Sequence, residues 1–427
     1  MIMKHVKTLI LGGGLTGLSL AYHLEQKGER DYLLIEKEPV LGGLCKSYQK
    51  QGFTFDCSGH LLHLHTSYGK MLVKKLLKDN LNCLTRKAFI YTGSSRIPFP
   101  FQANLWALPA PDRKQCLEGL LQALKSPRQT ADNFKDWCLL SFGSGIYEQF
   151  MRPYNTKLWG RSPEELTCEW CGPFVPTPSI EEIRQSVQQP LQKSYGYNDH
   201  FYYPAKGGAG ALITALARFV QNIQLNTPVS RIDLDKKTAL LGKEFVSFDT
   251  LVNTIALPVF LGLLSNVPEL SEKSAALAHT AVTVYHLAID RILPDFSWIY
   301  FPDPEDPFYR VGLQSGFSIH NAPEGTSLLY IELPGKHPVC ADEEKRIWKA
   351  LSQKGIIEKE DHKLFSHWQF LPHAYAVYDK NRTPAVQAVL AGLERRGCIC
   401  AGRYGKWEYS FMERSLLEGL EIAEKLV

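Results

Sequence analysis

A glycine-rich turn between two apolar runs near the N-terminus constrains the fold more than any other feature of this sequence. Residues 6–11 (VKTLIL) have the length and apolar character of a buried parallel strand. Residues 12–17 (GGGLTG) follow with the pattern G-x-G-x-x-G, and an apolar helical stripe and a second strand, residues 32–35, come next. This order of strand, glycine turn, helix and strand predicts a β–α–β unit at the start of a parallel sheet.

Each key position of this unit has a physical task. Gly12 allows the tight turn, Gly14 lets a pyrophosphate approach the backbone, and Gly17 permits close packing of the helix on the strand. The free N–H groups and the positive dipole end of the helix favour a phosphate. Glu36, directly after the second strand, can accept hydrogen bonds from a ribose diol. The unit therefore predicts dinucleotide binding.

A second glycine pair, Gly42-Gly43, lies just after the ribose-binding strand and suits an extended FAD. With it the chain resembles the amine-oxidase-like flavoprotein superfamily, which includes protoporphyrinogen oxidases and UDP-galactopyranose mutases. Further stretches that carry this resemblance are residues 53–60 (FTFDCSGH), 201–210 (FYYPAKGGAG), 228–232 (PVSRI) and 248–254 (FDTLVNT).

Within that superfamily the chain is most similar to the eukaryotic-type mutases. The similarity lies in residues 150–159 (FMRPYNTKLW), 307–310 (PFYR) and 401–409 (AGRYGKWEY). Residues 170–175 (WCGPFV) depart from the mutase pattern, because Phe174 stands where an arginine would help to clamp the UDP diphosphate; residues 410–415 (SFMERS) depart as well. An aromatic ring cannot replace the bidentate guanidinium. Either other cations bind the sugar nucleotide, or the substrate differs.

The resemblance implies an α/β fold with a Rossmann-like FAD-binding domain built on a parallel sheet, a helical segment and an antiparallel substrate sheet. We expect a discontinuous FAD-binding domain from residues 1–85, 201–270 and 396–427. Residues 86–200 are expected to be mainly helical, with Asp112 as an N-cap and an apolar core stripe at residues 117, 120, 121 and 124. Residues 271–395 are expected to form an antiparallel sheet that roofs the flavin.

The cofactor contacts that the resemblance implies come from the two glycine segments, the stretch after residue 58 and the C-terminal region. They are Gly12, Gly14, Leu15, Thr16, Gly17, Glu36, Lys37, Gly43, Leu44, Gly59, His60, Leu61, Val229, Gly402, Arg403, Met412 and Ser415.

The resemblance also implies the chemistry. In the mutases the N5 atom of reduced flavin attacks the anomeric carbon of a nucleotide sugar, which interconverts its pyranose and furanose forms for cell-surface polysaccharide synthesis. The implied catalytic residues are His60, Arg310, Arg403, Tyr375 and Tyr409, and the implied substrate-binding residues are Asn155, Trp159, Tyr203, Arg310, Tyr375 and Tyr409. In this scheme Arg310 neutralises the diphosphate, Tyr375 and Tyr409 donate hydroxyl groups to it, His60 lies against the isoalloxazine ring, and Arg403 lies near that ring or the sugar.

Two other classes of function remain open. The same fold supports FAD-dependent oxidation of an amine, a saturated ring or a carotenoid-like chain, and Phe174 favours such a substrate. A flavin-binding protein without catalysis is the third class. A mutase needs pre-reduced flavin and consumes no net oxygen or NAD(P)H, whereas an oxidase makes peroxide.

Composition excludes several classes of protein. Lys and Arg number 48 and Asp and Glu number 44, without a block of like charges, so we expect a small-molecule substrate and no nucleic-acid partner. No apolar run is long enough for a membrane span, and the apolar run at the N-terminus is too short for a signal peptide, so we expect a cytoplasmic protein.

The cysteine pairs Cys168/Cys171 and Cys398/Cys400 are too far apart in the sequence for a zinc site. On a strand His60 points away from His63 and His65. We therefore expect no metal.

Overall fold

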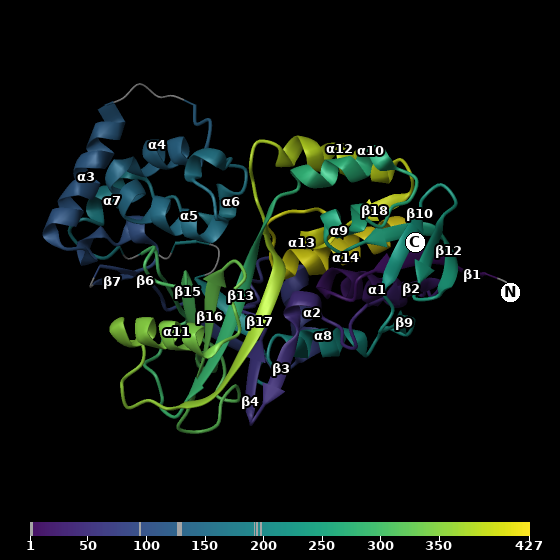
Figure 1. The fold of residues 1–427 in the computed structure, drawn as a ribbon, viewed down its shortest axis with the longest axis horizontal. Helices are drawn as coiled ribbons and strands as arrows, with labels where there is room; N and C mark the ends of the chain where they lie inside the picture. The colour runs from purple at the N-terminus through teal and green to yellow at the C-terminus, as the bar shows by residue number, and fades with distance from the viewer. Residues whose placement is uncertain (1–2, 94, 126–129, 192, 194, 197–198) are drawn as a thin grey trace.

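The computed structural model describes residues 3–93, 95–125, 130–191, 193, 195–196 and 199–427. In Figure 1 the lobe that contains both termini lies on the right, a second sheet lies at the lower left, and a group of helices lies above that sheet. The predicted fold class is confirmed, because a parallel-containing sheet, a helical region and a largely antiparallel sheet are all present.

The first sheet contains seven strands within the described residues, in the order β10-β11-β12-β1-β2-β9, with β18 paired to the far end of β12. Strands β1, β2, β9, β12 and β18 are mutually parallel where they pair, and β10 and β11 form an antiparallel extension. Their bounds are β1 Lys4–Leu11, β2 Tyr32–Ile35, β9 Ile223–Gln224, β10 Val229–Asp233, β11 Thr238–Leu241, β12 Glu244–Asn253 and β18 Cys398–Cys400. The sheet thus gathers three segments that are far apart in the sequence.

Helices cover both faces of this sheet because successive strand residues point to opposite sides. Ile10 packs in the cluster under α1, α2, α8 and α14, whereas Leu9 packs in the cluster under α9, α10 and α12. Gly419 in α14 has no room for a larger residue, since a Cβ there would lie 2.5 Å from Leu20 N in α1. The helices are α1 Leu15–Gln26, α2 Ser67–Leu77, α8 Gly210–Ala217, α9 Leu257–Leu261, α10 Pro268–Ser271, α12 Arg382–Glu394, α13 Gly402–Gly405 and α14 Met412–Leu426.

The second sheet, in the order β17-β13-β16-β15-β14-β6-β7, also has seven strands in the described part of the chain. Strands β13 to β17, from residues 271–395, pair antiparallel as predicted, and the one parallel pair in the described part of this sheet joins β14 to β6 from outside that range. Residues 88–92 and 95–98, which the prediction placed in the mainly helical region, form β6 and β7 of this sheet instead. The bounds are β6 Ala88–Thr92, β7 Ser95–Pro98, β13 His279–Ile289, β14 Trp298–Tyr300, β15 Arg310–Leu313, β16 Ser327–Pro334 and β17 Lys363–Ala376.

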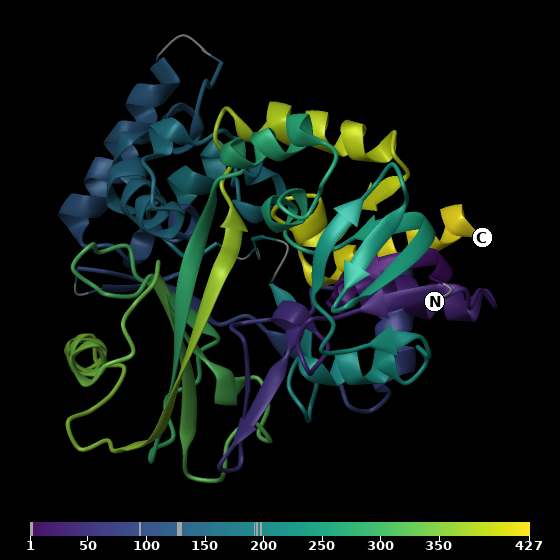
Figure 2. The same cartoon turned by 45° about the vertical axis from the view of Figure 1, so that its right-hand side comes forward.

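The long strands β13 and β17 run from the helical region down past the first lobe, as the turned view in Figure 2 shows. Helix α11 (Ala341–Gln353) packs on one face of this sheet through Ile347 and Leu351. Two short antiparallel pairs are also present: β3 (Ser47–Lys50) forms a hairpin with β4 (Phe53–Asp56), and β5 (Asn82–Thr85) pairs with the distant β8 (His200–Tyr203).

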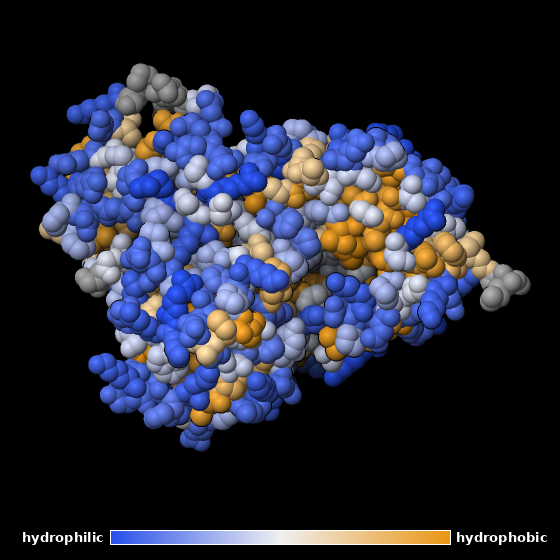
Figure 3. Space-filling view, in the orientation of Figure 1, coloured by the Kyte–Doolittle hydropathy of each residue, from blue (hydrophilic) through white to orange (hydrophobic). Residues whose placement is uncertain are grey.

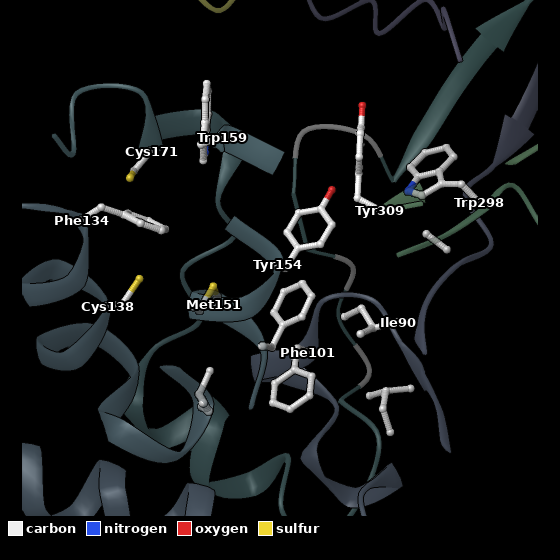
Figure 4. Packing of buried hydrophobic residues seen from close by; sticks show 14 of the residues in the cluster. Ile90, Phe101, Phe134, Cys138, Met151, Tyr154, Trp159, Cys171, Trp298 and Tyr309 are labelled. Carbon is white, nitrogen blue, oxygen red and sulfur yellow. The ribbon is translucent and has the colours of Figure 1, made fainter. Parts of the chain in front are cut away.

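The other face of the second sheet meets the helical region. There Tyr154 of the helical region lies edge-on to Tyr309, which precedes β15 (Figure 4). Within the helical region, Phe101 stacks on Phe150. The helices of this region are α3 Ala110–Lys125, α4 Phe134–Ile146, α5 Arg152–Trp159, α6 Cys171–Phe174 and α7 Ile180–Gln185.

The prediction for α3 was wrong in two respects. The helix begins at Ala110, so Asp112 lies in its first turn and is not the N-cap, because Pro111 suits the first turn of a helix. Leu121 and Leu124 are exposed. The helix instead faces α4 through Gly119, where a Cβ would lie 2.7 Å from Gly145 N. Close backbone approach at glycines replaces the expected leucine stripe.

The face seen in Figure 3 is hydrophilic over the helical region, while apolar residues gather over the first lobe. In the part of the chain that the structure describes, none of the helices combines the length and the apolar character needed to cross a membrane.

Candidate active site

A single cavity brings most of the predicted site residues together between the two sheets. It is lined by the turn before α1, the segment after β2, the loop after β4, strands β14 to β17 and the stretch that leads into α14. The predicted residues that line it are Gly14, Leu15, Thr16, Gly43, Leu44, Gly59, His60, Leu61, Arg310, Tyr375, Arg403, Tyr409, Met412 and Ser415. Predicted residues from six separate stretches of sequence thus share one space.

The glycine turn divides its tasks in the way that phosphate binding requires. Gly12 has a φ of 101°, which favours glycine, and a Cβ on Gly17 would overlap the carbonyl oxygen of Gly12. A Cβ on Gly14, by contrast, would meet no atom of the chain within 4 Å. Gly12 and Gly17 therefore serve the fold, whereas Gly14 borders open space.

The space beside Gly14 fits the pyrophosphate of a dinucleotide. Gly14 is the N-cap of α1 and provides no side-chain hydrogen bond to the first turn, so the N–H groups there remain available. The second glycine segment lies alongside, since Gly42 N donates to Gly13 O at 2.8 Å. Helix α14 also begins at the cavity, with Phe411 as an N-cap whose side chain does not cap the first turn. The donor set and the open backbone fit an anionic cofactor such as FAD.

Glu36 is bound to the turn. Its carboxylate accepts hydrogen bonds from Gly13 N at 2.9 Å and from Glu38 N at 3.0 Å, and the residue is buried. Each oxygen keeps a further acceptor position. Glu36 does not itself line the cavity, so its prediction as a ribose ligand remains a proposal.

Other predicted cofactor residues also lie outside the cavity lining. The Lys37 side chain is exposed beside Glu38, and Val229 begins β10. The backbone of Gly402 has a φ of 74°, and a Cβ there would overlap Thr16, so this glycine allows α13 to approach α1.

Arg310 has a protein partner that the sequence did not reveal. Its Nε donates to Glu332 Oε2 at 2.7 Å and its Nη2 donates to Glu332 Oε1 at 2.6 Å, which makes a bidentate pair across β15 and β16. The side chain of Glu332 is 2% exposed and that of Arg310 is 21% exposed. Burial by itself raises the pKa of Glu332, but the charge and hydrogen bonds of Arg310, with a hydrogen bond from Ser58, hold it below its ordinary value. Glu332 is therefore an anion, and the pair is neutral overall.

The signal for Glu332 was present but weak. It is the one charged residue in the run SLLYIELP of β16, whose other residues are apolar or uncharged. A buried carboxylate needs a partner, but only the register of β15 and β16 shows that the partner is Arg310.

Arg403 lies between two predicted tyrosines. Its guanidinium carbon is 5.1 Å from the ring centroids of both Tyr375 and Tyr409, a cation–π arrangement. Its Nη1 donates to Ser410 O at 3.0 Å and its Nη2 donates to Ala374 O at 2.8 Å. Burial raises the pKa of both tyrosines, so their hydroxyl groups stay protonated and can donate to a ligand.

Phe174 contributes an aromatic edge to the cavity wall. Its ring contacts Tyr409 edge-on, with 4.2 Å between the centroids, and Phe411 lies 6.5 Å away. Tyr300, Tyr309, Tyr330 and Trp298 line the same cavity. At position 174 the cavity wall therefore presents an aromatic ring, and Arg403 and Arg310 are the arginines among the described residues that line the cavity.

His60 lies in the cavity as an uncharged imidazole. Burial lowers its pKa to about 4, and its Nδ1 lies 3.3 Å from Ser58 O. His63 also lines the cavity, with its pKa lowered to about 4 by burial. The backbone N–H of His65 donates to Glu413 at 3.0 Å. Within the described residues, no group of three or more His, Cys, Asp or Glu side chains is arranged to hold a metal ion.

Three predicted substrate residues do not line the cavity, because the core occupies them. Asn155 is buried and its Nδ2 donates to Met151 O at 2.8 Å. Trp159 is buried against Trp170, and its ring centroid lies 5.8 Å from that of Tyr375. The Tyr203 hydroxyl donates to Asp56 at 2.7 Å. Asn155, Trp159 and Tyr203 therefore support the cavity from outside.

Comparison with known proteins agrees with this geometry. A family model described as flavin containing amine oxidoreductase matches residues 15–427. Among solved structures, reduced UDP-galactopyranose mutase is similar with a TM-score of 0.93 and 26% identity, covering 98% of this chain and 93% of that one. A protein described as a protoporphyrinogen oxidase, from Exiguobacterium sp. 255-15, has a TM-score of 0.75 and 17% identity over 100% of this chain and 99% of that one, which shows the shared fold alone.

Curated relatives match only locally. A Baeyer-Villiger monooxygenase of Pseudomonas aeruginosa is 36% identical over 58 residues, which is 14% of this chain and 11% of that protein. A 4-methylaminobutanoate oxidase of Paenarthrobacter nicotinovorans is 55% identical over 38 residues, 9% of this chain and 4% of that protein. The chain thus spans a small fraction of the length of these relatives.

Proposed function

Because the chain belongs to the flavin containing amine oxidoreductase family, which is FAD-dependent, we propose that it is a mutase that interconverts the pyranose and furanose forms of a nucleotide sugar. The observation that carries this proposal is the likeness to reduced UDP-galactopyranose mutase over 98% of the chain, at a TM-score of 0.93. Other solved structures of this fold have lower TM-scores, among them 0.75 for the protein described as a protoporphyrinogen oxidase and 0.66 for putrescine oxidase.

The residues around the cavity have separate tasks in this proposal. Gly14 and the first turn of α1 hold the FAD pyrophosphate, and Glu36 holds the adenosine ribose. Arg310 keeps N–H donors that Glu332 does not use, since two of its five donors make the bidentate pair. Those donors are available to a substrate phosphate oxygen.

Tyr375 and Tyr409 supply hydroxyl donors beside Arg403, and the tyrosine-rich wall excludes water from the sugar. His60, uncharged at neutral pH, offers a hydrogen bond without adding charge. When bound in its reduced form, FAD supplies the nucleophile for the anomeric carbon. The protein itself contributes position and electrostatics.

The test is to incubate the photoreduced protein with a panel of sugar nucleotides and to measure ring-isomer products by chromatography. We expect product without net consumption of oxygen or NAD(P)H. Tyr375→Phe should reduce turnover, while Tyr32→Phe removes a buried hydroxyl that donates to Glu25 and should leave turnover unchanged. If protein that is fully loaded with FAD forms no ring isomer from any sugar nucleotide, in either the oxidised or the reduced state, the mutase proposal is refuted.

A second candidate is an FAD-dependent oxidoreductase that accepts a hydride from an uncharged organic substrate. The observation that favours it is the edge-on contact of Phe174 with Tyr409, which places an aromatic ring in the cavity wall at position 174. The neutral Arg310–Glu332 pair points in the same direction, since it attracts a diphosphate less than a lone arginine would. Substrate-dependent peroxide formation by the oxidised protein would support this candidate instead.

A further inference from the structure

We propose that Ser58 is a positioning residue that fixes the cavity-lining loop of residues 58–61 to the second sheet. Its hydroxyl donates to Glu332 Oε1, and both side chains are buried. This hydrogen bond joins residues 274 positions apart in the sequence. The proposal rests on the FAD site and not on the choice between mutase and oxidoreductase.

The loop has few other constraints along its length. It follows β4 without regular secondary structure and lines the cavity with Ser58, Gly59, His60 and Leu61. Its entrance is held by Asp56, which accepts from Ala209 N at 2.9 Å. Its exit is held where Leu62 N donates to Tyr202 O at 3.0 Å. Ser58 provides a side-chain anchor between these two points.

The loop also rests on the sheet beside that anchor. A Cβ on Gly59 would overlap the hydroxyl of Tyr330, so the backbone of the loop lies directly on this ring. Tyr330 and Glu332 are two residues apart on β16 and point to the same face. Ser58 and Gly59 therefore contact neighbouring side chains of one strand, and the hydrogen bond sets how the loop lies on them.

The anchor is connected to Arg310 through one oxygen atom. Glu332 Oε1 accepts both the Ser58 hydroxyl and Arg310 Nη2, while Oε2 accepts Arg310 Nε. Without the hydroxyl, a buried carboxylate loses a donor and its negative charge is less compensated. The loop would also lose its tether. Because the loop and Glu332 both line the cavity, the change in charge and the loss of the tether would both affect a cofactor bound there.

The expected direction follows from charge. A reduced flavin carries two more electrons than an oxidised one, so a less compensated carboxylate nearby disfavours reduction. Ser58→Ala should therefore lower the midpoint potential of bound FAD. It should also weaken FAD binding by the apoprotein, because the loop that lines the cavity loses its tether.

The experiment measures the midpoint potential by spectroelectrochemistry and FAD affinity by titration of the apoprotein. Ser58→Thr keeps the hydroxyl and should restore the wild-type potential. The matched control is Ser327→Ala, which removes a buried hydroxyl from the same strand as Glu332, where it accepts from Leu293 N at 2.8 Å. The control should lower thermal stability and leave the potential unchanged.

An unchanged potential in Ser58→Ala would overturn the proposal, as would a shift of the same size in Ser58→Thr or in Ser327→Ala. If Ser58→Ala does not fold, Ser58→Cys provides the test, because a thiol has a similar size and is a weaker donor. It should shift the potential in the same direction by a smaller amount. No shift, or a shift to higher potential, would refute the role of the hydroxyl. None of these outcomes depends on finding sugar-isomerase activity.

Discussion

The Arg310–Glu332 pair gives a quantitative test of how the site is built. Arg310→Met leaves the carboxylate of Glu332 buried without its main partner, and Glu332→Gln leaves the guanidinium without an anion. Breaking a buried pair from one side costs about 3–5 kcal/mol. Removing both charges together should cost much less than the sum, because the double variant leaves no unpaired buried charge.

The expected change in melting temperature follows from chain length. At about 2.1 cal/mol/K per residue, a chain of 427 residues has an unfolding entropy of about 0.9 kcal/mol/K. A loss of 3–5 kcal/mol then lowers the melting temperature by about 3–6 °C if the whole chain unfolds together. Calorimetry of both single variants and the double variant, in a fixed excess of FAD, measures this. Single-variant losses that add up in the double variant would refute the pairing.

The same variants separate a structural arginine from one that binds substrate. If the remaining donors of Arg310 hold a diphosphate, Arg310→Met should weaken binding of UDP to the reduced protein about tenfold or more, the scale of a charge-assisted hydrogen bond. Flavin content should not change. A destabilised variant with wild-type UDP affinity would remove Arg310 from the substrate site and favour the oxidoreductase.

Three further predictions concern the cofactor site and pH. Gly14→Val should fold with an unchanged apoprotein melting temperature but lose FAD, because a Cβ there meets no protein atom within 4 Å and fills the pyrophosphate space; stoichiometric FAD in the purified variant would contradict this. Glu36→Ala should weaken FAD affinity roughly 10- to 150-fold in an apoprotein titration, and unchanged affinity would exclude a ribose contact. Burial lowers the pKa of His60 and His63 to about 4, whereas in the unfolded chain both titrate near their ordinary value of about 6.5. The free energy of unfolding of the apoprotein should therefore be unaffected by these two groups above pH 6.5 and should fall as the pH drops from 6.5 toward 4. For each histidine the loss is about 3 kcal/mol. Urea unfolding of His60→Gln should show a smaller loss over that range, and an identical pH profile would count against the shift.

Sequence alone determined the β–α–β unit and the FAD turn. These features are local: Gly12, Gly14 and Gly17 act through their own backbone and their immediate neighbours, and strand, turn and helix are contiguous in the chain. The predicted convergence of Arg310, Tyr375, Arg403 and Tyr409 came from family resemblance, and the cavity contains all four.

Tertiary structure alone decided the partners of those residues. Arg310 meets Glu332 only because β15 and β16 pair in one register, and Ser58 reaches Glu332 only because the loop after β4 folds onto the same strand. Trp159 and Tyr203 have the residue types of a ligand site, but neighbouring elements bury them in the core. Strand register and burial depend on contacts between distant segments, and a side chain's type and spacing along the chain carry no record of which segment will lie against it.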